Sequence, residues 1–148
     1  MRYPAAILAL ACAVQLQAGG LDEFLNNLNV RAQADRNGFA VQVASQFHVG
    51  DATVRMVLGD VPRPADAFMV FQMAQMTGRP HEEVLRTYKA GRGRGWGELA
   101  KELGIKPGSA EFHRLKNGDF RFGREDEGPG RGKGKGKGKG HGKGHGRD

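Results

Sequence analysis

The stretch RPADAFMVFQMAQMTGRPHEEVLRTYK (residues 63–89) contains the signals of two consecutive helices and decides the fold class. Pro64 stands where a helix can begin, Gly78 marks its end, and Pro80 opens the next helix, which runs to Lys89. The first helix is expected to bury one side, formed by Ala67, Phe68, Phe71, Ala74 and Gln75. The second helix is expected to bury Val84, Leu85 and Tyr88.

The same helical spacing of apolar residues extends toward the N-terminus. Residues 21–32 place apolar side chains on one helix face, and the turn residues 35–38 are expected to end that helix. Residues 39–47 also fit a helix, although Val41 and Val43 leave a strand open as an alternative.

Further short helices are indicated by their start and stop residues. Asp51 is expected to cap one helix, Trp96 begins another that stops at Gly104, and Ser109 caps the last. The sequence therefore predicts an all-α compact bundle of about six short helices, formed by residues 19–118, with a helix-turn-helix-like corner at its C-terminal end.

That corner, WGELAKELGIKPGSAEFHRL (residues 96–115), has the small residue, the turn glycine and the flanking apolar residues of a helix-turn-helix motif. A role as a nucleic-acid binder is one interpretation, and a purely structural corner is the other. The outward residues of the second helix, with one acid and two bases, are a poor set for reading base edges; they are Ala110, Glu111, Arg114 and Lys116.

Glycine alternates with arginine in AGRGRGWG (residues 90–97), just before this corner. Arg92 and Arg94 suggest a contact with nucleic acid in which Trp96 provides a stacking surface. The alternative is a loop whose arginines are solvated and whose tryptophan lies in the core.

Three blocks resemble a group of small, exported, uncharacterised bacterial helical proteins with a Gly/Lys/His-rich tail. They are NNLNVRAQAD (residues 26–35), RPADAFMV (residues 63–70) and GRGWGELAKELGIKPGSAEFHRLKNG (residues 93–118). The resemblance implies an exported helical protein and carries no activity to transfer.

The first eighteen residues have the pattern of a secretory signal peptide. Arg2 precedes an apolar run at residues 5–16 that is too short to span a bilayer, and Ala18 offers the small residue that a signal peptidase requires. A buried N-terminal helix and a lipoprotein site at Cys12 are the alternatives. We expect an exported protein, located in the periplasm or outside the cell, whose mature form lacks cysteine.

The net charge of +7 is concentrated at the C-terminal end of the chain. Residues 19–127 contain fifteen basic and fifteen acidic residues, whereas residues 128–148 contain seven basic residues and one acid. From Gly128 onward, alternate glycines and an absence of apolar residues leave nothing to bury. Residues 119–148 are expected to form a disordered cationic tail.

This tail has two candidate chemistries. Its basic residues would bind a polyanion loosely and in a salt-dependent manner, and they are Arg131, Lys133, Lys135, Lys137, Lys139, Lys143 and Arg147. His141 and His145 would instead bind Cu(II), Ni(II) or Zn(II) weakly, and no other cofactor is expected.

No arrangement typical of catalysis stands out, since Ser45 and Ser109 lie outside any nucleophile elbow and the three histidines before the tail share no ligand spacing. We therefore expect a non-enzymatic exported protein whose tail contacts an anionic envelope polymer or lipid surface. A periplasmic metal-binding protein and a helix-turn-helix-like nucleic-acid binder are the alternatives, nucleic acid being the less expected partner of an exported chain.

Overall fold

The computed structural model describes residues 19–123, and every regular element within that range is a helix, so the all-α fold class is confirmed. This part of the chain contains seven helices, in agreement with the expected bundle of about six short helices. Their bounds are α1 Gly20–Ala34, α2 Arg36–Phe47, α3 Asp51–Asp60, α4 Pro64–Thr77, α5 His81–Ala90, α6 Trp96–Glu102 and α7 Ala110–Asn117.

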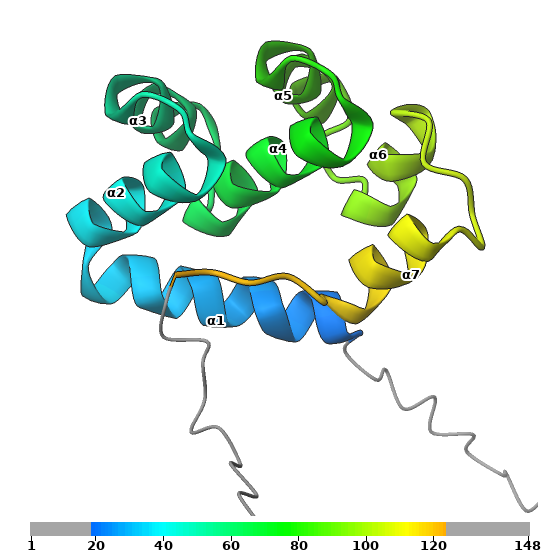
Figure 1. Cartoon of the computed structure of the whole chain (residues 1–148), viewed down its shortest axis with the longest axis horizontal. Helices are drawn as coiled ribbons and strands as arrows, with labels where there is room; N and C mark the ends of the chain where they lie inside the picture. The colour runs from blue at the N-terminus through cyan, green and yellow to red at the C-terminus, as the bar shows by residue number, and fades with distance from the viewer. Residues whose placement is uncertain (1–18, 124–148) are drawn as a thin grey trace, which may run out of the picture.

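Helix α4 is the centre of the bundle. It packs against α1, α2, α3 and α5, and Figure 1 shows it in the middle, with α1 along one edge between α7 and α2. Every residue from Ala65 to Met73 is buried, so α4 has no solvent-facing side over that length. The prediction of a single buried face is therefore too narrow, and Gln75, which was expected on that face, is exposed.

Several predicted helix ends are confirmed because they rest on local backbone chemistry. Pro64 is the first residue of α4, and Gly78 ends it in the left-handed conformation with a φ of 67°. The Ser109 side chain accepts a hydrogen bond from the backbone N–H of Phe112 at 3.2 Å and so caps α7.

The boundary between α1 and α2 differs from the prediction. Only Asp35 is non-helical there, because its carboxylate accepts a hydrogen bond from the N–H of Gly38 at 2.8 Å and starts α2 at once. The strand alternative at residues 39–47 is wrong, since those residues lie in α2. Asp51 is the first residue of α3 rather than its cap, which is Gly50.

The folded chain does not end at Gly118, and this corrects the predicted start of the tail at residue 119. We call residues 119–123 the strap, because they run along α1 after α7 (Figure 1). Phe122 is buried and its ring lies 4.9 Å from that of Phe39, while the ring of Phe120 lies 5.7 Å from that of Phe24. These aromatic contacts are the physical reason that the strap belongs to the core.

Two glycines allow the start of α1 to cross the end of α7. Gly118 has a φ of 66°, and a Cβ added to it would lie 2.5 Å from the carbonyl oxygen of Gly20. A Cβ on Gly20 would collide with the carbonyl of Asn117. The crossing brings the N-terminal end of the described chain against the residues that lead into the strap.

Candidate functional site

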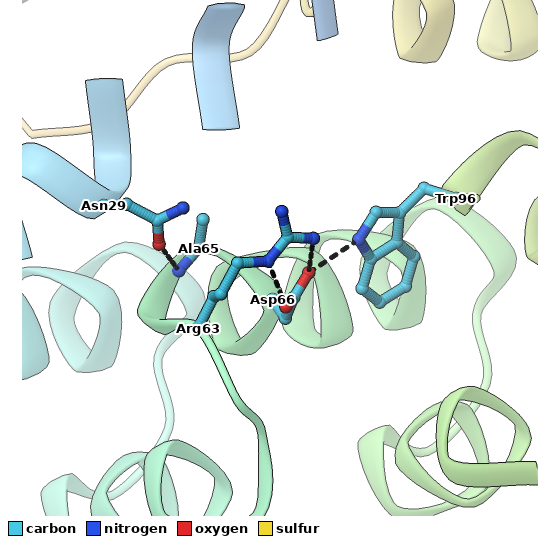
Figure 2. A network of polar contacts seen from close by, with 5 residues as sticks. All are labelled: Asn29, Arg63, Ala65, Asp66 and Trp96. Carbon is cyan, nitrogen blue, oxygen red and sulfur yellow. Dashed lines mark hydrogen bonds and ion pairs between the residues drawn. The ribbon is translucent and has the colours of Figure 1, made fainter. Parts of the chain in front are cut away.

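A buried carboxylate organises the first turn of α4. The side chain of Asp66 is fully buried, and it accepts two hydrogen bonds from Arg63, at 3.1 Å from Nε and 3.2 Å from Nη2. Its Oδ1 also accepts a hydrogen bond from the indole Nε1 of Trp96 at 3.0 Å (Figure 2). A buried carboxylate needs such partners, and the bond from Trp96 also ties the first residue of α6 to the first turn of α4.

The first turn of α4 is also fixed by α1. The side-chain Oδ1 of Asn29 accepts a hydrogen bond from the backbone N–H of Ala65 at 2.9 Å (Figure 2). Because the first N–H groups of a helix have no partner within the helix, Asn29 caps α4 from a distant part of the chain. The position of Arg63 and Asp66 is thus set by two different neighbouring segments.

A groove of 640 Å³ lies beside this network. One wall is the first turns of α1, with Asp22, and the other walls are residues 59–63, Tyr88 of α5 and the loop at residues 92–95. Gly93 and Gly95 stand in open space, since a Cβ added to either would meet no atom within 4 Å. The volume lies in the range of small-molecule sites, and apolar and charged groups are mixed on its walls.

The rings of Tyr88 and Trp96 stack in the wall of the groove, with centroids 5.0 Å apart and planes inclined by 14°. Burial, together with the negative charge of Asp66, raises the pKa of Tyr88 to about 12. The hydrogen bond to Asp66 likewise raises the pKa of Arg63 above its ordinary value. At neutral pH the groove therefore presents a neutral phenol and a fixed guanidinium.

Most charged residues at the groove have an ionic partner within the described part of the chain. Asp60 pairs with Lys89 at 2.7 Å, and Arg94 pairs with Glu102 at 3.0 Å. For Asp22 and Arg92, both exposed, the described residues provide no ion pair. Asp22 and Arg92 are thus the charged groups of the groove without an ion pair among the described residues, while the half-exposed Arg63 guanidinium, on which the charge of Asp22 also acts, adds a second cation to the wall.

The structure decides between the two interpretations of the glycine-arginine loop. Trp96 is 5% exposed and its indole N–H is engaged by Asp66, so it lies in the core and offers no free stacking surface. The prediction of Trp96 as a stacking surface for nucleic acid is therefore wrong. The arginines of the loop are exposed, as the alternative expected.

Helices α6 and α7 form the predicted corner, and the outward residues of α7 are exposed as expected: Ala110, Glu111, Arg114 and Lys116. The predicted signal peptide at residues 1–18 lies outside the described residues, and so do all the predicted tail ligands. These are Arg131, Lys133, Lys135, Lys137, Lys139, His141, Lys143, His145 and Arg147.

Among residues 19–123, no helix combines the length and the apolar character that crossing a membrane requires. Within the same part of the chain, no group of three His, Cys, Asp or Glu side chains is placed to hold a metal ion.

Sequence reasoning missed the groove and its central residue. In the sequence, Asp66 is an acid in the first turn of a predicted helix. Its favourable interaction with the helix dipole is enough to explain an acid at that position. Its partner Trp96 is thirty residues away, and no local pattern joins the two. The RPADAFMV block at residues 63–70 contains both Arg63 and Asp66, and it was the one available signal.

Comparison with known protein families, with characterised proteins and with solved structures finds no match to this chain.

Proposed function

We propose that this chain is an exported, non-enzymatic protein whose basic C-terminal segment, residues 128–148, binds an anionic polymer or lipid surface of the cell envelope. The observation that carries the proposal is the separation of charge: seven basic residues and one acid stand in this segment, against equal numbers in residues 19–127. Such a segment attracts polyanions without requiring a shaped site.

Several charges of the helical body are paired with one another, and this supports the assignment. Arg55 lies 2.6 Å from Asp51, Lys101 lies 2.6 Å from Glu98, and Arg79 pairs with Glu83. Exposed pairs of this kind add little stability, but they reduce the field that the body presents to a partner. The C-terminal segment is therefore the part of the chain that we expect to attract an anionic partner at long range.

The spacing of the lysines suits a flexible polyanion or an anionic membrane surface. Lysines two residues apart in extended chain are separated by roughly 6.6–7.2 Å. Each Lys or Arg near an anionic membrane contributes on the order of 1 kcal/mol, and the attraction weakens as salt shortens the Debye length. Seven basic residues are sufficient for binding at low salt that is lost at high salt.

The test compares the mature chain with a chain that lacks residues 128–148. Both are titrated with vesicles containing about one third phosphatidylglycerol, at low salt and at about 0.5 M salt. We expect binding by the longer chain alone, and only at low salt. Equal binding by the two chains would refute the proposal. Replacing the seven basic residues with glutamine provides a control of the same length.

Two further measurements test the remaining parts of the proposal. Sequencing the mature N-terminus tests export, since cleavage after Ala18 leaves Gly19 first. Calorimetry with Cu(II) and Ni(II), on the full chain and on a variant with His141 and His145 both changed to Ala, tests the alternative of metal binding. A heat that disappears in the double variant would favour metal binding over polyanion binding as the role of this segment.

A further inference from the structure

We propose that the groove between α1, residues 59–63 and the loop at residues 92–95 binds a short peptide with both termini free, about two residues long and apolar in its side chains. In this arrangement Arg92 binds the carboxylate of the peptide and Asp22 binds its ammonium group. This site is separate from the basic C-terminal segment, and the inference does not depend on the function proposed for that segment.

The charge of the groove favours a ligand with one positive and one negative group. Within the described residues, three charged groups of the groove wall already have partners: Arg63 with Asp66, Asp60 with Lys89, and Arg94 with Glu102. Arg92 and Asp22 are the wall charges without an ion pair, and Asp22 also acts at longer range on the Arg63 guanidinium. A dianion would be repelled by Asp22 and a dication by Arg92, whereas a zwitterion matches both.

The size and the apolar part of the groove favour a dipeptide. Its volume of 640 Å³ is more than a single small amino acid requires, and it lies within the usual range of small-molecule sites. Leu21, Leu25 and Val61 contribute apolar surface next to the Tyr88–Trp96 stack. The terminal groups of an extended dipeptide are about 7 Å apart, which suits two charges on different elements, as Asp22 of α1 and Arg92 of the loop are.

The walls that carry the two charges are held firmly in different ways. Asp22 lies in the first turn of α1, whose N-terminal end is fixed by the crossing with α7. Arg92 lies in the glycine-rich loop, which is anchored by the bond from Trp96 to the buried Asp66 (Figure 2). Because the Gly93 and Gly95 positions are open, the loop backbone is accessible to a ligand.

The experiment uses leucyl-leucine as the probe, together with two chemical analogues that each lack one of its charges. N-acetyl-leucyl-leucine keeps only the carboxylate, and leucyl-leucine amide keeps only the ammonium group. Trp96 is the single tryptophan of the chain and stands in the groove wall, so its fluorescence reports occupancy of the groove. Chemical-shift changes of the backbone amides then place the probe.

We expect leucyl-leucine to bind at least about tenfold more tightly than either analogue. Arg92→Gln and Asp22→Asn should each raise the dissociation constant for leucyl-leucine about tenfold. Each analogue should respond to only one variant. Binding of the amide should be unchanged by Arg92→Gln, and binding of the acetylated peptide should be unchanged by Asp22→Asn.

The control variants are Arg86→Gln and Glu23→Gln, which remove exposed charges of the same sign from α5 and α1 outside the groove wall. All four altered side chains are exposed, and unchanged far-ultraviolet circular dichroism will show that each variant is folded. Three results would each overturn the proposal: no saturable binding of leucyl-leucine up to about 10 mM, equal binding of the three probes, or groove variants that bind as the control variants do.

Discussion

Replacement of Phe122 by alanine tests whether the strap is part of the folded core. Phe122 is 1% exposed, and its ring lies 4.9 Å from the ring of Phe39 and 5.8 Å from that of Phe68. Removing a buried phenylalanine costs about 3–5 kcal/mol, which combines the lost transfer free energy with the cavity that remains. A domain of this size has a total free energy of unfolding of about 5–15 kcal/mol, so the loss is a large part of its stability.

The measurement is thermal and urea unfolding followed by circular dichroism. A loss of this size should lower the Tm by roughly 12–25 °C. Arg121→Ala is the matched control, because Arg121 is exposed between Phe120 and Phe122 and only its backbone carbonyl bonds to Gln46, at 2.7 Å. If Phe122→Ala is no more destabilising than Arg121→Ala, the strap does not belong to the core and the fold ends at Gly118.

Three further predictions concern other parts of the described chain. Asp66→Ala should lower the free energy of unfolding by about 2–3 kcal/mol, and Asp66→Asn by less because it keeps an acceptor for Trp96; urea unfolding followed by fluorescence measures both. His48→Gly should stabilise the chain by about 0.5–1 kcal/mol in the same assay, since His48 has a φ of 55° at the end of α2. The pKa of Tyr88 is raised from 10.0 to about 12, so the unfolded state loses a proton over that interval that the folded state keeps. Stability should therefore fall as pH rises from about 10 to about 12, and Tyr88→Phe should flatten that part of the profile.

Helix ends could be predicted from the sequence because they depend on residues next to one another. Pro64 and Gly78 bound α4, and Ser109 caps α7, each through a backbone or side-chain preference that acts within a few residues. The resulting set of short helices, without a strand pattern, was enough to give the fold class of residues 19–123.

Features that depend on distant residues were not predicted. The capping of the N-terminal end of α4 by Asn29, and the burial of α4 on all sides, depend on how α1, α2, α3 and α5 surround it. Asp66 and Trp96 are connected only in the folded chain, and without that contact the loop before α6 looked like a nucleic-acid motif. Gly118 correctly ended a helix, but the end of a helix is not the end of a fold, and the two phenylalanines that follow it were therefore assigned to the tail.

The strap also determines how the two proposed activities are arranged along α1. Phe122 lies near the C-terminal end of α1, with the Arg31 guanidinium 6.0 Å from its ring centre, so the strap ends at that end of the helix (Figure 1). Asp22 and the groove lie at the other end of the same helix, nine residues or about 14 Å away along its axis. Binding at the two places should be independent, because the end of the strap and the groove lie at opposite ends of α1. The dissociation constant for leucyl-leucine should accordingly be the same in the full chain and in the chain that lacks residues 128–148, and a difference larger than about threefold would show that the C-terminal segment reaches the groove.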